Sequence, residues 1–217
     1  MKIYFKELKK LTPTLLSTII KMNEEVGELS REVNKFFPYV GYTEKQLRSN
    51  KYAKDLLSKV IGELLDVGQT ACTMFFLLHR KKEIDSTLVI TKHLTKLKSK
   101  QYIVNSSHNY NDYYLEMDDD NCIISLPRLD IDTDLIRTFL QIAEEVGELS
   151  QLVGKKTGMS GEKNQLPAEE INNLIANELL DVAQCCVTML YILARFGIDV
   201  DTILDNHIQK LHEHGYC

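Results

Sequence analysis

Apolar side chains recur every three or four residues through most of the chain, the spacing that places them on one face of an α-helix. The first stripe follows Thr12 and Pro13, a helix cap with proline in the first turn, and a second follows Asp132 or Thr133. The stripes consist of Leu15, Leu16, Ile19, Ile20, Val26 and Leu29, and of Leu135, Ile136, Phe139 and Leu140. The pattern therefore predicts two similar amphipathic helices.

Two longer and more apolar helices are expected over about 52–82 and about 167–196. Asp85, and Asp199 or Asp201, are placed to cap one last helix after each of them. Strand signals are few, and only KIYF and CIISL could pair as a small ribbon. The predicted fold class is therefore all-α, with the helices packed as bundles.

The sequence contains an internal duplication. Three blocks recur in the same order, and they pair 21–35 with 141–155, 62–74 with 177–189, and 84–102 with 198–216. EEVGELS occurs in both members of the first pair, and ELLDV in both members of the second. The length differences fall between the blocks, where loops tolerate them. Three collinear blocks indicate two homologous halves, 1–104 and 121–217, joined by a polar linker at 105–120.

Composition narrows the class of protein. The 217 residues are 44% hydrophobic and 26% charged, which is typical of a globular protein, and the net charge of −5 disfavours a nucleic-acid polymer as partner. The N-terminus does not resemble a signal peptide, and MFFLL and CCVTMLYILA are too short to cross a bilayer, so no membrane association is expected. Five cysteines without CxxC spacing suggest reduced thiols and a cytoplasmic location.

Carboxylates repeat with the duplication. Glu25 and Glu28, like Glu63 and Asp66, are three residues apart and share a helix face, so four carboxylates meet if the two helices are antiparallel neighbours. The second half carries the same set as Glu145, Glu148, Glu178 and Asp181. Such a cluster facing a bundle interior needs a cation, and oxygen ligands without His or Cys favour Mg²⁺, then Mn²⁺.

Two other interpretations of these carboxylates are less favoured. A solvated helix face is the common reason for such charges, but both acidic pairs recur in both halves, and the second pair lies in an otherwise apolar helix. A di-iron bundle would need Glu-x-x-His elements, which these glutamates lack. A metal site is therefore favoured.

EEVGE followed by ELLD, present twice, resembles the EExxE and ExxD motifs of the MazG-like branch of the all-α NTP pyrophosphatases, over most of both halves. The resemblance implies two MazG-like helical repeats packed as a pseudo-dimeric bundle whose halves complete each other, with further homo-oligomerisation left open. It implies that the eight carboxylates hold Mg²⁺ while a nucleoside triphosphate is cleaved between its α and β phosphates, releasing a monophosphate and pyrophosphate. Glu24 and Glu144 would then orient or deprotonate the attacking water.

The family also tends to end with a helix bearing Lys-x-x-x-Arg, whose cations meet the phosphates. The corresponding residues here are Lys96 and Lys100 in the first half, and Lys210 and His214 in the second. Both halves lack the arginine, and an imidazole carries only part of a charge, so the second half is expected to be the weaker. Lys35 and Lys155, on the two EEVGE helices, are further phosphate candidates or simply solvated lysines.

Other corresponding pairs have simpler expected roles. His93 and His207 are expected to pack or to form hydrogen bonds along the last helices, and Tyr102 and Tyr216 to pack at their ends. Two further functions stay open beside the triphosphate pyrophosphohydrolase. One is a nucleotide- or metal-binding scaffold of the same fold without turnover, and the other is a pyrophosphohydrolase for another nucleotide such as phosphoribosyl-ATP. The preference for base and sugar depends on loops whose course the sequence does not determine.

Overall fold

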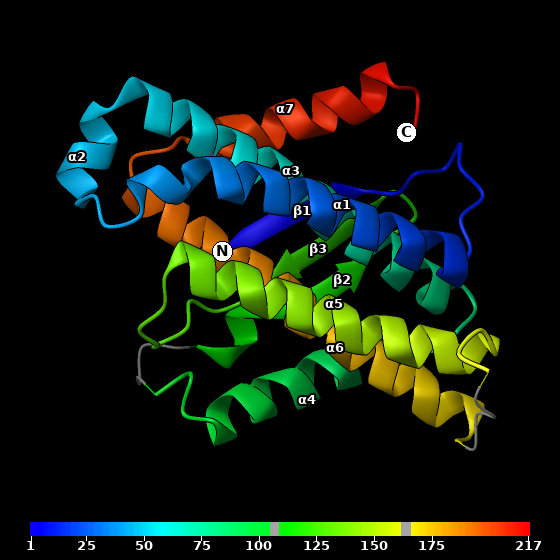
Figure 1. The fold of residues 1–217 in the computed structure, drawn as a ribbon. Helices are drawn as coiled ribbons and strands as arrows, with labels where there is room; N and C mark the ends of the chain where they lie inside the picture. The colour runs from blue at the N-terminus through cyan, green and yellow to red at the C-terminus, as the bar shows by residue number, and fades with distance from the viewer. Residues whose placement is uncertain (105–108, 162–165) are drawn as a thin grey trace.

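Four long helices form the centre of the protein, in a computed structural model that describes residues 1–104, 109–161 and 166–217. They are α1 (Leu15–Phe36), α3 (Lys51–Arg80), α5 (Leu135–Thr157) and α6 (Ala168–Arg195). Within each half α1 packs on α3 and α5 on α6, and across the halves α1 contacts α5 and α3 contacts α6 (Figure 1). The prediction of a mostly helical protein is confirmed.

The helices begin close to their predicted starts, because side-chain caps bind their first free amides. Thr14 caps α1 in a capping box with Ser17, and Asp134 caps α5, so the true caps lie one or two residues after the predicted ones. The two last helices, α4 (Ser86–Ser99) and α7 (Val200–Glu213), are capped by Asp85 and Asp199, as predicted.

A short helix, α2 (Glu44–Ser49), connects the first half to the end of α6. Glu44 forms an ion pair with Arg195 at 2.7 Å, and the Arg48 guanidinium donates to the carbonyl of Arg195 at 2.6 Å. Carbonyls in the last turn of a helix have no partner within that helix. Arg48 therefore supplies the hydrogen bond that the Arg195 carbonyl cannot receive within α6. A 3₁₀ turn, η1 (Phe37–Tyr39), leads from α1 towards α2.

A three-stranded antiparallel sheet lies beside the helices, in the order β1 (Lys2–Lys6), β3 (Asn121–Ser125), β2 (Tyr114–Met117). β1 pairs with β3 from Lys2↔Ser125 to Lys6↔Asn121, so the predicted ribbon of KIYF with CIISL is confirmed. β2 and the 3₁₀ turn η2 (Tyr110–Asp112) lie within the stretch expected to be a polar linker. That part of the linker therefore has regular structure, while 105–108 lie outside the described residues.

The last helix of each half packs on the other half. α4 lies along α6, and α7 lies along α3, on opposite sides of the four long helices (Figure 1). Equivalent backbone contacts hold the ends of both helices: Asp130 N donates to Tyr102 O at 2.8 Å, and Lys10 N donates to Tyr216 O at 3.4 Å. Each half therefore supplies side chains to the long helices of its partner.

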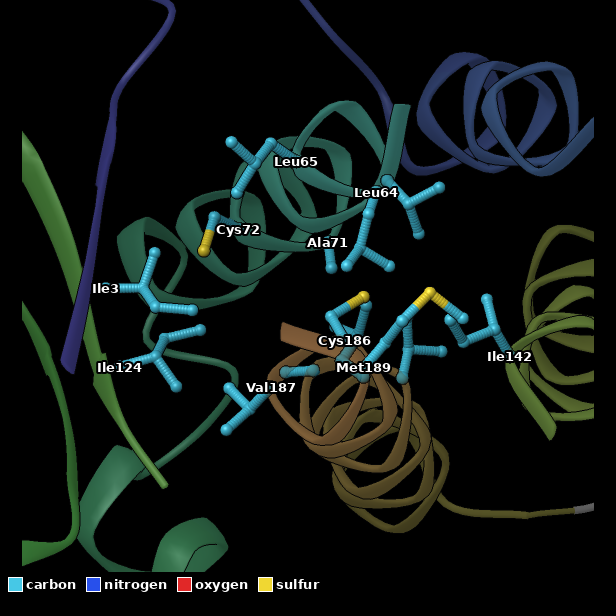
Figure 2. Packing of buried hydrophobic residues seen from close by; sticks show 14 of the residues in the cluster. Ile3, Leu64, Leu65, Ala71, Cys72, Ile124, Ile142, Cys186, Val187 and Met189 are labelled. Carbon is cyan, nitrogen blue, oxygen red and sulfur yellow. The ribbon is translucent and has the colours of Figure 1, made fainter. Parts of the chain in front are cut away.

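The core lies where α3, α6 and the sheet meet. Figure 2 shows Leu64 and Ala71 of α3 facing Cys186 and Met189 of α6, with Ile142 of α5 at one side. Ile3 and Ile124, opposite each other in the sheet, face the same core from the other side. All five cysteines are free, and burial raises the pKa of Cys186 to about 12, so this residue acts as a small apolar side chain in the core.

Two of the described helices, α3 and α6, are long and apolar enough to cross a membrane by length and composition. The short apolar runs MFFLL and CCVTMLYILA therefore underestimate the length of the apolar part of each helix. In the folded protein 72% of the α3 window and 78% of the α6 window are buried. A helix that is apolar on most sides is typical of the centre of a bundle, and the apolar character of both helices is explained by this packing.

Gly68 provides a test of the contact between α3 and the sheet. A Cβ at this position would lie 2.7 Å from Cζ of the buried Phe5 ring, which packs edge-on against His207. We expect Gly68→Ala to lower the free energy of unfolding by about 1–2 kcal/mol, since overpacking outweighs the gain in helix propensity. Gly62→Ala on the same helix, with nothing within 4 Å, should instead raise it by about 0.5–1 kcal/mol. Urea unfolding of both variants measures the difference, and equal effects would contradict this packing.

Candidate functional site

Three carboxylates of the second half converge where α5 packs on α6. Glu145 of α5 and Glu178 and Asp181 of α6 each offer a carboxylate oxygen, and these oxygens lie within 4.8 Å of one another. We call these residues the second-half cluster. Glu148 belongs to the predicted set but is exposed and lies outside this close group. Three of the four predicted carboxylates therefore meet.

Two side chains of the other half bind Asp181. The Lys96 ammonium forms an ion pair with Oδ2, and His93 Nδ1 lies 3.3 Å from Oδ1. Behind His93, its Nε2 lies 3.5 Å from Oε1 of Gln184, whose amide nitrogen donates to the carbonyl of Pro127 at 3.0 Å. The buried Asp181 thus has a cation on one oxygen and a fixed imidazole on the other.

The two glutamates of this cluster lack such compensation. Burial, with repulsion from Asp181 and Glu178, raises the pKa of Glu145 to about 7. Burial and the same aspartate also raise the pKa of Glu178, whose buried Oε2 has no hydrogen-bond partner among the described residues. Burial opposes ionisation of Asp181 too, but the bonds from His93 and Lys96 lower its pKa. The cluster therefore holds more negative charge than its neighbours neutralise.

A cavity of about 290 Å³ opens onto the second-half cluster. Glu144, Glu145, Glu148 and Asp181 line its acidic side, and Lys96 of α4 and Lys100, its C-terminal cap, also line it. Its remaining walls are mixed: Leu97, Tyr102, Leu129, Ile131 and Cys185 are apolar or aromatic, and Gln141, Gln184 and Thr188 are polar. The cavity therefore combines carboxylates, ammonium groups and apolar surface contributed by both halves.

The equivalent first-half cluster consists of Glu25, Glu28 and Glu63, whose carboxylate oxygens also lie within 4.8 Å of one another. Burial raises the pKa of Glu25 and of Glu63; Lys21 opposes the shift at Glu25, and neighbouring carboxylates add to the shift at Glu63. Lys21 makes an ion pair with the buried Glu25 at 2.7 Å. In the first-half cluster, Glu25 is therefore already paired with an ammonium group.

Asp66 does not belong to the close group of the first half. Lys210 of α7 donates to its Oδ2 at 2.8 Å, and His207 Nδ1 lies 3.6 Å from its Oδ1. These contacts mirror those of Asp181 with Lys96 and His93. They differ in the next layer, because His207 Nε2 and Gln69 Oε1 are buried without a hydrogen-bond partner in the described part of the chain.

The other predicted site residues have varied positions. Glu144 lines the cavity, whereas Glu24 is exposed and pairs with Lys21 at 3.0 Å. Lys35 donates to Glu32 at 2.6 Å, and Lys155 lies in the last turn of α5. Neither of these two lines the cavity described above.

The last-helix cations also differ from one another. Lys100 lines the cavity with its ammonium 5.9 Å from the centre of the Tyr102 ring. His214 ends α7, and its ring lies edge-on to Tyr216 at 5.5 Å between centroids. Since α7 packs on α3, His214 accompanies the first-half carboxylates. The expected weakness from His214 therefore concerns the first-half cluster rather than the second.

Sequence reasoning missed two features of these clusters. His93 and His207 were assigned general packing or hydrogen-bonding roles, but both rings are buried against an aspartate of the other half. The signal was present, since the two histidines correspond in the duplication. Lys21 was not considered because its counterpart in the second half is Gln141, so it was not part of the shared motif.

Comparison of the chain with family models, with curated proteins and with solved structures gives no match in any of the three. The geometry of the two clusters and the motif resemblance are therefore the features of this chain that bear on its function.

The raised pKa of Glu145 predicts how stability depends on pH without metal. The folded protein holds this proton more tightly than the unfolded chain, so its contribution to stability is greatest below about pH 4.5 and is lost as the pH rises to about 7. In EDTA at pH 7.5, Glu145→Gln should raise the free energy of unfolding by about 1 kcal/mol after solvent screening, with a smaller gain at pH 4.5. Urea titrations at both pH values measure this.

The control is Glu144→Gln, which changes the exposed neighbour and should alter stability by less than about 0.5 kcal/mol at either pH. A Glu145→Gln variant that is less stable than the wild type at pH 7.5 would contradict the described electrostatics.

Proposed function

We propose that this chain is a Mg²⁺-dependent nucleoside triphosphate pyrophosphohydrolase that cleaves the bond between the α and β phosphates. The observation that supports it most is the second-half cluster, where uncompensated carboxylates lie beside a cavity that also receives Lys96 and Lys100. Acidic groups for a divalent ion and ammonium groups for phosphate oxygens thus share one cavity. Phosphoryl chemistry needs both, since its catalysis consists mainly of positioning and charge stabilisation.

The residues of this cluster fit a hard divalent cation. All close donors are carboxylate oxygens, which suit Mg²⁺ and also Mn²⁺. Glu145 and Glu178 would supply the ligands most readily, because Glu178 Oε2 is buried without a partner among the described residues and neither carboxylate has a cation of its own comparable to Lys96 on Asp181. When bound, Mg²⁺ would neutralise phosphate oxygens and help a bound water to ionise.

The side chains around the cavity have separable roles in this proposal. Lys100, whose ammonium faces Tyr102 at the cavity wall, binds a phosphate oxygen of the substrate. Lys96 stays near Asp181, and His93 holds that aspartate in place from behind. Glu144, at the acidic side of the cavity, accepts the proton of the attacking water. Pyrophosphate and a nucleoside monophosphate are the products.

The exchange of last helices supports a pseudo-dimeric arrangement of two homologous repeats. Each cluster takes its carboxylates from one half and its lysine and histidine from the other. Two-fold related copies of one bundle would make the same paired contacts across an isologous interface. The proposal places the protein in the cytoplasm, where its free cysteines stay reduced, with a nucleoside triphosphate as partner rather than a nucleic-acid polymer or a membrane.

Pyrophosphate release from a panel of ribo- and deoxyribonucleoside triphosphates tests the activity. With Mg²⁺, Glu178→Gln should lower kcat/KM by about 100-fold or more, because it removes a ligand that stabilises charge in the transition state. Glu170→Gln, an exposed change in the first turn of the same helix, should leave kcat/KM within about twofold. Nucleotide binding without release from any substrate in the panel would contradict the proposal and favour the scaffold alternative.

Lys100 tests the phosphate contact separately from the metal. Lys100→Met should raise KM by about tenfold with a smaller effect on kcat, since about 1.4 kcal/mol of substrate binding is lost. Lys98→Met is the matched control, because the Lys98 ammonium instead lies 5.6 Å from the Tyr110 ring centre and does not line the cavity. Steady-state kinetics on the best substrate of the panel measures both, and equal effects would exclude a specific role for Lys100.

A further inference from the structure

The two clusters differ at one position that lies one helical turn before the EEVGE motif. α1 carries Lys21 there, and the duplication aligns it with Gln141 of α5. The Lys21 ammonium lies 2.7 Å from Glu25 and 3.0 Å from Glu24. The Glu25 side chain is only 8% exposed, so this is more than a contact between two solvated side chains. Gln141 has no charge to offer Glu145, the counterpart of Glu25.

The cavities beside the two clusters differ in the same way. The first-half counterpart has a volume of about 270 Å³ and is lined by Leu11, Thr70 and Thr73, whose counterparts Ile131, Cys185 and Thr188 line the second-half cavity. Lys21 lines it too, but none of Glu25, Glu28 and Glu63 does, as far as the described residues extend. In the second half two of the three cluster carboxylates, Glu145 and Asp181, line the cavity directly. Lys21 therefore lies between the first-half cavity and its carboxylates.

The histidine that contacts the aspartate has a glutamine partner in the second-half cluster only. Gln184 Oε1 reaches the His93 ring, which contacts Asp181. In the first half Gln69 is held by the carbonyl of Lys6 at 2.7 Å, yet its oxygen and His207 Nε2 both remain without a partner in the described residues. Lys100 lines the second-half cavity, whereas the corresponding residue on α7 is His214. Each difference leaves the first half less able to hold a metal and a phosphate.

We propose that only the second-half cluster binds the divalent ion and the triphosphate, and that Lys21 serves as a built-in cation that closes the first-half cluster. The proposal rests on the proposed function and assigns it to one site per chain. An ammonium group on Glu25 neutralises the charge that a metal would otherwise neutralise, and it occupies the approach from the cavity. The first half then acts through α4, which supplies Lys96, Lys100 and His93 to the second-half site.

Mn²⁺ binding to the full metal-free chain tests this assignment without requiring turnover, with bound and free Mn²⁺ measured by electron paramagnetic resonance. As a single substitution in the otherwise unchanged chain, Glu178→Gln should raise the Kd of every bound Mn²⁺ ion by at least about tenfold. Lys21→Gln should increase the number of Mn²⁺ ions bound per chain, and the increase should disappear in the double variant with Glu63→Gln. Gln141→Lys, which places the first-half lysine in the second half, should weaken wild-type binding by at least about tenfold.

The controls separate this inference from the proposed function. Lys45→Gln, an exposed change on α2, should not alter the number of bound ions, and urea unfolding checks that every variant is folded. If Glu178→Gln retains half of the bound Mn²⁺, or if Lys21→Gln gains none, the asymmetry is wrong while the proposed enzyme stands. If the wild type binds no Mn²⁺ and releases no pyrophosphate, both proposals fail.

Discussion

The packing of carboxylates between long helices is the constraint on which the rest of this structure depends. Each pair of long helices brings three carboxylates together at the edge of an apolar core, three glutamates in the first half and two glutamates with Asp181 in the second. Carboxylates at that spacing repel one another, and burial adds to the cost, which is why the pKa values of Glu25, Glu63, Glu145 and Glu178 are raised. Lys96 on Asp181 and Lys210 on Asp66, both from the last helices, offset part of this repulsion.

The exchange of last helices follows from this need. α4 and α7 each carry a lysine and a histidine one turn apart, and each packs on the long helix of the other half. Neither half by itself, as arranged here, would bring a lysine to its own aspartate. The duplication therefore does more than repeat a unit, since each repeat completes the charge balance of the other. The sheet adds a further link, because β1 of the first half pairs with β3 at the start of the second.

The sequence allowed the helical class to be predicted, because helical periodicity is a local signal. The ribbon of KIYF with CIISL was also predicted, since both are short apolar stretches. β2 was not, because its YLEM sequence lies within a polar stretch and becomes a strand only by pairing with β3. The side of the molecule on which α4 and α7 pack is a tertiary choice that no local pattern encodes. For that reason the contacts of His93 and His207 with the aspartates were not predicted, and His214 was placed with the second half although α7 packs on α3.

A duplicated site within one chain is also free to diverge in a way that a symmetric dimer is not. In a homodimer every substitution appears at both sites, so a lysine that closes one would close the other. Here Lys21 and Gln141 occupy equivalent positions with different consequences, and the supporting layer differs in parallel at Gln69 and Gln184. A lysine on Glu25 lessens the repulsion in the first-half cluster without any bound metal. In the proposed assignment the first half thereby serves as a stable partner, while the second-half cluster keeps uncompensated charge for the proposed metal ion.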